Sequence, residues 1–147
     1  RKAKEGGVVV FVPKDLQPLP LQHINLPTDI VAISVQKPME ICIVCAYRSE
    51  QWSCKEFLKT LHTVIEHVNI PICIVGDMNE DILVKNKQPI HDFCAQNGFM
   101  QHITEPTTDY GSALDHIYTR NLHTVHNHVI DCYYSDHDIT YCCVALT

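Results

Sequence analysis

The segment that most constrains the fold is residues 72–81, ICIVGDMNED. Its first four residues are apolar and mostly β-branched, which is typical of a strand buried on both faces of a sheet. Gly76 ends this predicted strand, and Asp77 and Asn79 follow just past its C-terminal end, where open α/β sheets place their chemistry. Two residues apart on an extended segment, these two side chains can project the same way. Asp and Asn are also ordinary turn residues after glycine, so the segment alone leaves both a turn and a site open.

The composition is that of a globular protein. The chain has 147 residues, of which 46% are hydrophobic and 19% charged, and its net charge is −6. One domain over residues 1–147 is therefore expected, with no membrane partner, because no apolar run approaches the ~20 residues of a membrane span. The negative charge argues against a broadly basic nucleic-acid surface. It still permits a phosphate substrate, because a bound divalent cation can supply the local positive charge.

The eight cysteines do not have the pattern of a disulfide scaffold. Five of them, Cys42, Cys45, Cys73, Cys142 and Cys143, lie in apolar runs, where free cysteine behaves as a small hydrophobic residue. The first two have CxxC spacing, but no second such pair or matched histidine pair completes a zinc site. We therefore expect reduced cysteines in the core of an intracellular protein.

Hydrophobic periodicity predicts the remaining elements of an α/β fold with a mixed sheet. Ser53 and Glu56 have the spacing of a capping box at the start of a helix. This helix joins two strands in a parallel crossover, whereas the short connection at Lys37-Pro38 predicts an antiparallel pair. The predicted strands cover residues 8–12, 29–35, 39–46, 99–103, 114–119, 124–130 and 139–146, and the predicted helices run from about 50–53 to 69 and over 89–97.

Polar side chains stand beside two more of the predicted strands. Tyr47 and Arg48 follow the strand over residues 39–46, and a phenol and a guanidinium are good donors to phosphate oxygens. A surface tyrosine and a solvated arginine are the alternative. Asp115 lies inside a strand with apolar neighbours, which is costly unless another group pairs with its carboxylate. His116 faces the opposite side and is expected to be structural, so the partner must come from elsewhere.

A polar turn between two predicted strands supplies a candidate partner for Asp115. Its residues 134–138, YSDHD, place Asp136 and His137 side by side. A carboxylate that binds an imidazole sets its tautomer and raises its basicity. A solvated loop is the alternative. His126 and His128 share one face of another strand and could bind a metal, although no third ligand is evident.

Considered together, these segments resemble the endonuclease/exonuclease/phosphatase superfamily. Its GDxN, (S/T)xxDH and SDH motifs are matched in order and spacing by residues 76–79, 112–116 and 135–137, after Tyr47-Arg48. Residues 105–108, running into 112–119, look most like the subgroup carried by mobile elements, which includes LINE-type retrotransposons and Helitron-associated endonucleases. The Gly6-Gly7 strand resembles that subgroup too.

This resemblance implies a DNase I-like four-layer α/β sandwich that hydrolyses phosphodiesters with Mg²⁺, or alternatively Mn²⁺, as cofactor. Asp77 would orient or deprotonate the attacking water and bind the metal. Asn79 would hold the water or a phosphate oxygen. His137 would contact the scissile phosphate or act as acid and base, with Asp115 behind it. The other implied roles are a metal ligand, Asp136, and three phosphate contacts, Tyr47, Arg48 and Ser112.

The family also has an Asn and a metal-binding Glu that precede its Gly-Gly strand, and no residue before Gly6 supplies them. The chain is therefore expected to be the C-terminal portion of the domain, with impaired metal binding. The resemblance implies DNA as partner, possible fusion to a helicase or reverse transcriptase, and a nuclear location. A phosphatase acting on small phosphoesters, such as an inositol phosphate or lipid head group, and a non-catalytic remnant that binds a partner stay open as alternatives.

Overall fold

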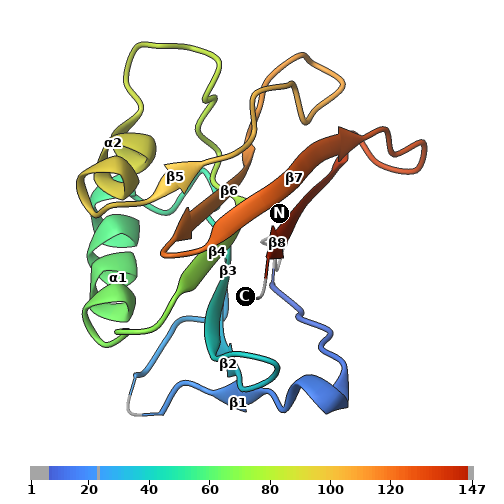
Figure 1. Cartoon of the computed structure of the whole chain (residues 1–147). Coiled ribbons are helices and arrows are strands. Elements are labelled where there is room, and N and C mark those ends of the chain that lie inside the picture. Colours follow the sequence, from blue (N-terminus) through green and yellow to red (C-terminus); the bar gives the residue numbers. More distant parts are fainter. Residues whose placement is uncertain (1–6, 23, 146–147) are drawn as a thin grey trace.

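A six-stranded mixed sheet organises the chain (Figure 1). The computed structural model describes residues 7–22 and 24–145. Only the central pair, β3 and β4, is parallel, and every other neighbouring pair is antiparallel. The sheet has the order β1 (Leu19–Pro20), β2 (Ile30–Val35), β3 (Ile41–Tyr47), β4 (Ile72–Asp77), β6 (Asp115–Arg120) and β5 (Met100–Gln101).

Two helices and a two-stranded sheet lie on opposite sides of this sheet (Figure 1). The second sheet pairs β7 (His123–Ile130) with β8 (Ile139–Ala145), antiparallel. The helices are α1 (Cys54–Glu66) and α2 (Pro89–Gln96), and a short 3-10 turn covers Lys14–Leu16. The described residues therefore form three layers, and none of them forms a further helical layer outside β7 and β8.

Alternation along β4 explains why the sheet packs on both faces. Ile72 and Ile74 belong to the larger core cluster, which includes buried side chains of α1 such as Leu61. Cys73 and Val75 pack against the second cluster, with contributions from β7 and β8. Side chains of a strand point alternately to the two faces, so each set meets a different layer. The prediction of a strand packed on both faces is confirmed.

The connection from β3 through α1 to β4 is also confirmed as a parallel crossover. Helix α1 begins as the sequence predicts, because the Ser53 hydroxyl accepts a hydrogen bond from the Glu56 N–H at 3.2 Å. The helix ends at Glu66, three residues before the predicted end. The antiparallel pairing of the two strands around Lys37-Pro38 is confirmed by β2 and β3.

Three element predictions are wrong in extent or existence. Residues 8–12 form no strand: their segment has no ladder partner among the described residues, and Val9 and Phe11 are 75% and 93% exposed. Gly6, which belonged to that prediction, lies outside the described residues. Strand β5 covers two residues rather than five, although the His102 N–H still bonds the Ile117 carbonyl. Gly76 lies inside β4, which continues to Asp77.

The cysteines are free and differ in burial. All eight lie in the described ranges, and none forms a disulfide there. Burial raises the pKa of Cys42 to about 12, which keeps this thiol neutral. Cys143 is exposed, so its predicted place in the core is wrong. Within the described ranges, neither helix has the length and apolar character needed to span a bilayer.

Candidate active site

Three neighbouring strands bring Tyr47, Asp77 and Asp115 into one row at the edge of the sheet. Tyr47 ends β3 opposite Asp77, which ends β4. Asp115 begins β6 and pairs with Asp77 on the other side. Strands β3 and β4 run parallel, and β6 runs antiparallel to β4. The C-terminal ends of β3 and β4 therefore lie beside the N-terminal end of β6 at this edge of the sheet.

His137 meets this row from the loop between β7 and β8. Its Nδ1 lies 2.8 Å from Asp115 Oδ2. A carboxylate only accepts, so Nδ1 carries the proton in this hydrogen bond and Nε2 is left for another partner. An isolated β-bridge between His137 and Thr108 holds the histidine backbone in place. Asp115 thus has the imidazole partner that its setting requires.

Thr107 is a site residue that sequence reasoning missed. Its buried hydroxyl donates to Asp115 Oδ2 at 2.7 Å and accepts from the backbone N–H groups of Leu114 at 3.0 Å and Asp115 at 3.2 Å. One hydroxyl therefore orients the carboxylate and closes the loop before β6. The sequence showed only a threonine in a polar loop, and polarity does not reveal that such a residue is buried.

The loop after β4 is held by Arg48. Its guanidinium donates three hydrogen bonds to backbone carbonyls. Nε donates to Met78 at 2.7 Å, Nη2 to Asn79 at 2.8 Å and Nη1 to Trp52 at 3.1 Å. Asn79 has φ +48° and donates from Nδ2 to the Arg48 carbonyl at 2.7 Å, while its N–H donates to Asp77 Oδ1 at 3.0 Å. The geometry favours loop support by Arg48 over the predicted phosphate contact.

The other predicted site residues lie at the margin. Asp136 is exposed, and its backbone carbonyl accepts from the Asp109 N–H at 3.1 Å. Ser112 lies in the turn before β6, where its hydroxyl is 2.7 Å from that of Thr108. His116 is fully buried; burial lowers its pKa, so its neutral ring donates from Nε2 to the Glu80 carbonyl at 2.7 Å. The expectation that His116 is structural is confirmed.

One group of side chains in the described ranges could hold a metal ion. The ligand atoms of Asp77, Asp115 and His137 all lie within 4.8 Å of one another. Carboxylate oxygens suit hard divalent cations such as Mg²⁺, and an imidazole nitrogen is also accepted by Mn²⁺. The donor set therefore fits the predicted cation. Asp136 is not part of this group.

The charges in the group influence one another. Burial raises the pKa of Asp77 against the lowering effect of the Asn79 N–H, and the charge of Asp115 raises it further. Burial alone would lower the pKa of His137, but its hydrogen bond to Asp115 and the charges of Asp115, Asp77 and Asp136 raise it overall. Two adjacent carboxylates that repel each other are stabilised by a cation between them.

Comparisons with known proteins were made for the sequence and for the structure. No protein-family model and no curated protein matches the sequence. The endonuclease domain of TRAS1, a telomere-specific non-LTR retrotransposon, superposes with a TM-score of 0.73 at 18% identity, over 84% of this chain and 64% of that one. A mannosyl-6-phosphatase from Bacteroides thetaiotaomicron superposes with a TM-score of 0.55 at 14% identity, over 80% of this chain and 56% of that one.

The chain therefore has a fold like that of the retrotransposon endonuclease domain and of the mannosyl-6-phosphatase. The DNase I-like α/β fold class predicted from the sequence is thereby confirmed. An endonuclease/exonuclease/phosphatase family protein from Bacteroides thetaiotaomicron superposes with a TM-score of 0.47 at 15% identity, over 74% of this chain and 52% of that one. The chain spans 64% of the length of the retrotransposon endonuclease domain.

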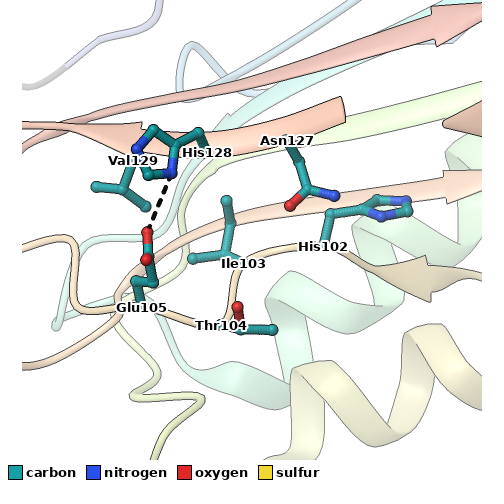
Figure 2. Close-up of a pocket in the computed structure, with 7 residues that line it drawn as sticks. All are labelled: His102, Ile103, Thr104, Glu105, Asn127, His128 and Val129. Atoms are coloured by element: carbon teal, nitrogen blue, oxygen red, sulfur yellow. Dashed lines mark ion pairs between the residues drawn. The ribbon is translucent and has the colours of Figure 1, made fainter. Parts of the chain in front are cut away.

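Among the residues that the structure describes, the histidines on β7 do not join a second metal group. His128 Nδ1 lies 3.4 Å from Glu105 Oε2, across a pocket of about 100 Å³ between β7 and the loop after β5 (Figure 2). The rings of His126 and His128 are 6.5 Å apart. An exposed ion pair of this kind contributes little to stability. The pocket is lined by His102, Ile103, Thr104, Glu105, Asn127, His128 and Val129.

We expect the imidazole of His137 to titrate above the ordinary histidine pKa of about 6.5, because Asp115 raises its pKa. A histidine whose pKa is raised on folding stabilises the fold fully below its unfolded pKa, and this contribution disappears as the pH rises through the folded pKa. Asp115→Asn should lower the pKa of His137. Side-chain NMR titration of both proteins without metal measures this, and an unchanged pKa in the variant would contradict it.

Proposed function

We propose that this chain belongs to a metal-dependent phosphodiester hydrolase that cleaves DNA, an endonuclease of mobile-element type. The observation that carries the proposal is the cluster of Asp77, Asp115 and His137 at one edge of the sheet. Its support is the superposition on a retrotransposon endonuclease domain, together with the motifs that surround the cluster in the sequence.

The residues have complementary chemical roles in this proposal. Asp77 accepts a proton from the attacking water or orients it, since its carboxylate lies within 4.8 Å of the imidazole of His137. His137, bound through Nδ1 to Asp115, presents Nε2 to a phosphate oxygen or to the leaving group. Thr107 keeps the Asp115 carboxylate aligned for this task. Tyr47, at the end of the adjacent strand, contacts the phosphate.

Asp77 and Asp115 would hold Mg²⁺ or Mn²⁺. When bound, such a cation neutralises charge on the phosphate oxygens and makes water a better nucleophile. Asp136, predicted as a metal ligand, acts in this proposal through its charge, which raises the pKa of His137. Asn79 and Ser112 remain proposed phosphate contacts.

The proposal includes a nuclear location and DNA as partner, with a helicase or reverse transcriptase as possible fusion partners. A second candidate function is hydrolysis of a small phosphoester. The observation that favours it is the superposition on a mannosyl-6-phosphatase. The two candidates share the cluster, so the substrate must separate them.

The deciding experiment incubates the full-length product of the gene with supercoiled plasmid and Mg²⁺. We expect nicking, with loss of nicking when EDTA removes the metal, because the two carboxylates need a cation to receive a phosphate. The same protein, with Mg²⁺ and with EDTA, is also incubated with sugar phosphates and inositol phosphates, and the release of inorganic phosphate is measured. Phosphate release with intact plasmid would establish the phosphatase, and no turnover of either substrate would favour the non-catalytic remnant.

A further inference from the structure

The loop between β7 and β8, which carries His137 of the proposed active site, also carries two almost fully exposed tyrosines. Tyr133 and Tyr134 are 91% and 99% exposed, and they precede His137 by only a few residues. Large aromatic side chains that remain in water beside a site are typical of surfaces that bind a ligand. Neither ring supports the core, so the fold alone does not explain them.

Hydrogen bonds hold this loop in one shape. The Cys132 N–H donates to Asp138 Oδ1 at 2.9 Å, which closes the turn around the two tyrosines. The Asp138 N–H donates to the Thr107 carbonyl at 2.8 Å, and Thr107 also binds the Asp115 carboxylate. The tyrosines are therefore mounted on the same framework that positions His137, and their backbone is ordered before any ligand binds.

A hollow of about 490 Å³ adjoins the first tyrosine. It is bordered by Tyr133, by the end of β7 and by the start of the loop. Val129 and Ile130 make part of its wall apolar, and His128 and Asp131 add polar edges. A flat ring with polar edges, such as a nucleobase, matches a surface that combines aromatic, aliphatic and hydrogen-bonding groups.

We propose that Tyr133 and Tyr134 form a stacking surface for nucleobases beside the scissile phosphate, and so select polynucleotides over small phosphoesters. The inference rests on the proposed function, and it assigns the substrate class of that site to chains with accessible bases. Tyrosine stacks on every base through its π-face, so this surface contributes affinity without reading the sequence. Because both tyrosines lie on the loop that carries His137, a base stacked on them would be held by the same loop that presents the imidazole to the phosphate.

The test compares two substrates on the full-length protein with Mg²⁺: a single-stranded oligonucleotide and bis(p-nitrophenyl) phosphate, a phosphodiester without bases. For the double variant Y133A/Y134A, the ratio of kcat/KM for the oligonucleotide to that for the small diester should fall about tenfold or more, mainly through KM, because the loss of base stacking on two aromatic rings is worth at least that factor. Y133F/Y134F keeps both rings and should restore the ratio to within about threefold of the wild-type value.

Phe11→Ala is the matched control, because Phe11 is also almost fully exposed but lies outside the His137 loop. We expect this variant to keep the wild-type ratio. An unchanged ratio in Y133A/Y134A, with active wild-type protein, would overturn the stacking surface and leave the proposed function intact. A wild-type protein that nicks plasmid but leaves the single-stranded oligonucleotide intact would also overturn this inference alone. A wild-type protein that cleaves neither plasmid nor oligonucleotide would overturn the proposed function, and this inference with it.

Discussion

His137→Ala is expected to lower the rate of metal-dependent phosphodiester hydrolysis by about 100- to 10,000-fold, the range typical of a lost general acid or base. His137 is the imidazole that Asp115 binds at 2.8 Å, and its Nε2 is the nitrogen available to the substrate. The side chain is one-third exposed, so truncation removes little packing. The variant should therefore fold normally. Plasmid nicking rates and thermal unfolding, measured on the full-length protein, check both expectations.

His62→Ala is the matched control, because His62 is an exposed histidine on α1 and forms an i,i+4 pair with Glu66. Its substitution should leave the nicking rate within about twofold, since an exposed helical pair is worth only about 0.3–0.5 kcal/mol of stability. A His137→Ala variant that keeps a tenth or more of the wild-type rate would show that another group transfers the proton.

Gly76→Ala is expected to destabilise the fold by more than about 4 kcal/mol, in the range of the most severe single substitutions. Gly76 has φ +142°, a conformation that L side chains rarely adopt. A Cβ built there would lie 1.8 Å from the Ala46 carbonyl oxygen, which is backbone of the neighbouring strand and cannot move without separating β3 from β4. Denaturant unfolding of the 147-residue chain measures the loss.

Gly111→Ala controls for backbone strain without a clash. Gly111 has φ +82°, and a Cβ there would have no heavy atom within 4 Å. Only the conformational cost remains, about 1–2 kcal/mol for an L residue in the left-handed region. If Gly76→Ala and Gly111→Ala lower the free energy of unfolding by similar amounts, the clash with Ala46 does not contribute to the effect of Gly76→Ala, which would contradict this prediction. Asp77 directly follows Gly76 and belongs to the candidate site. A Gly76→Ala variant that folds only in part should therefore also lose nicking, because Asp77 would no longer be held in place.

The local pattern of the chain predicted most elements, and its failures have physical causes. The helix from Ser53 was predictable because its cap and its apolar stripe are both local signals. The strand over residues 8–12 was mispredicted because an apolar run specifies a strand only where a partner completes its hydrogen bonds. The local pattern predicts a strand end at Gly76, because the close approach of Gly76 to Ala46 depends on a neighbouring strand that the local pattern does not contain.

The candidate site was likewise predictable from the sequence only in part. Asp77, Asp115 and His137 were chosen from polar residues beside apolar runs, and the structure brings their ligand atoms together. Asp136 was chosen with them but lies exposed outside the group. Sequence reasoning missed Thr107, because the sequence does not distinguish an exposed loop threonine from a buried threonine whose hydroxyl makes three hydrogen bonds.

The sequence by itself determined the α/β class, the order of the elements and the polar segments that follow them, because periodicity, caps and glycines act over a few residues. Only the tertiary structure decided which groups meet. Asp115 and His137 are 22 residues apart, and their contact depends on the β4–β6 register and on the loop held by Thr107. Only the tertiary structure also shows that Arg48 donates to backbone carbonyls and that Tyr133 and Tyr134 remain in solvent, because burial and pairing are properties of the assembled layers.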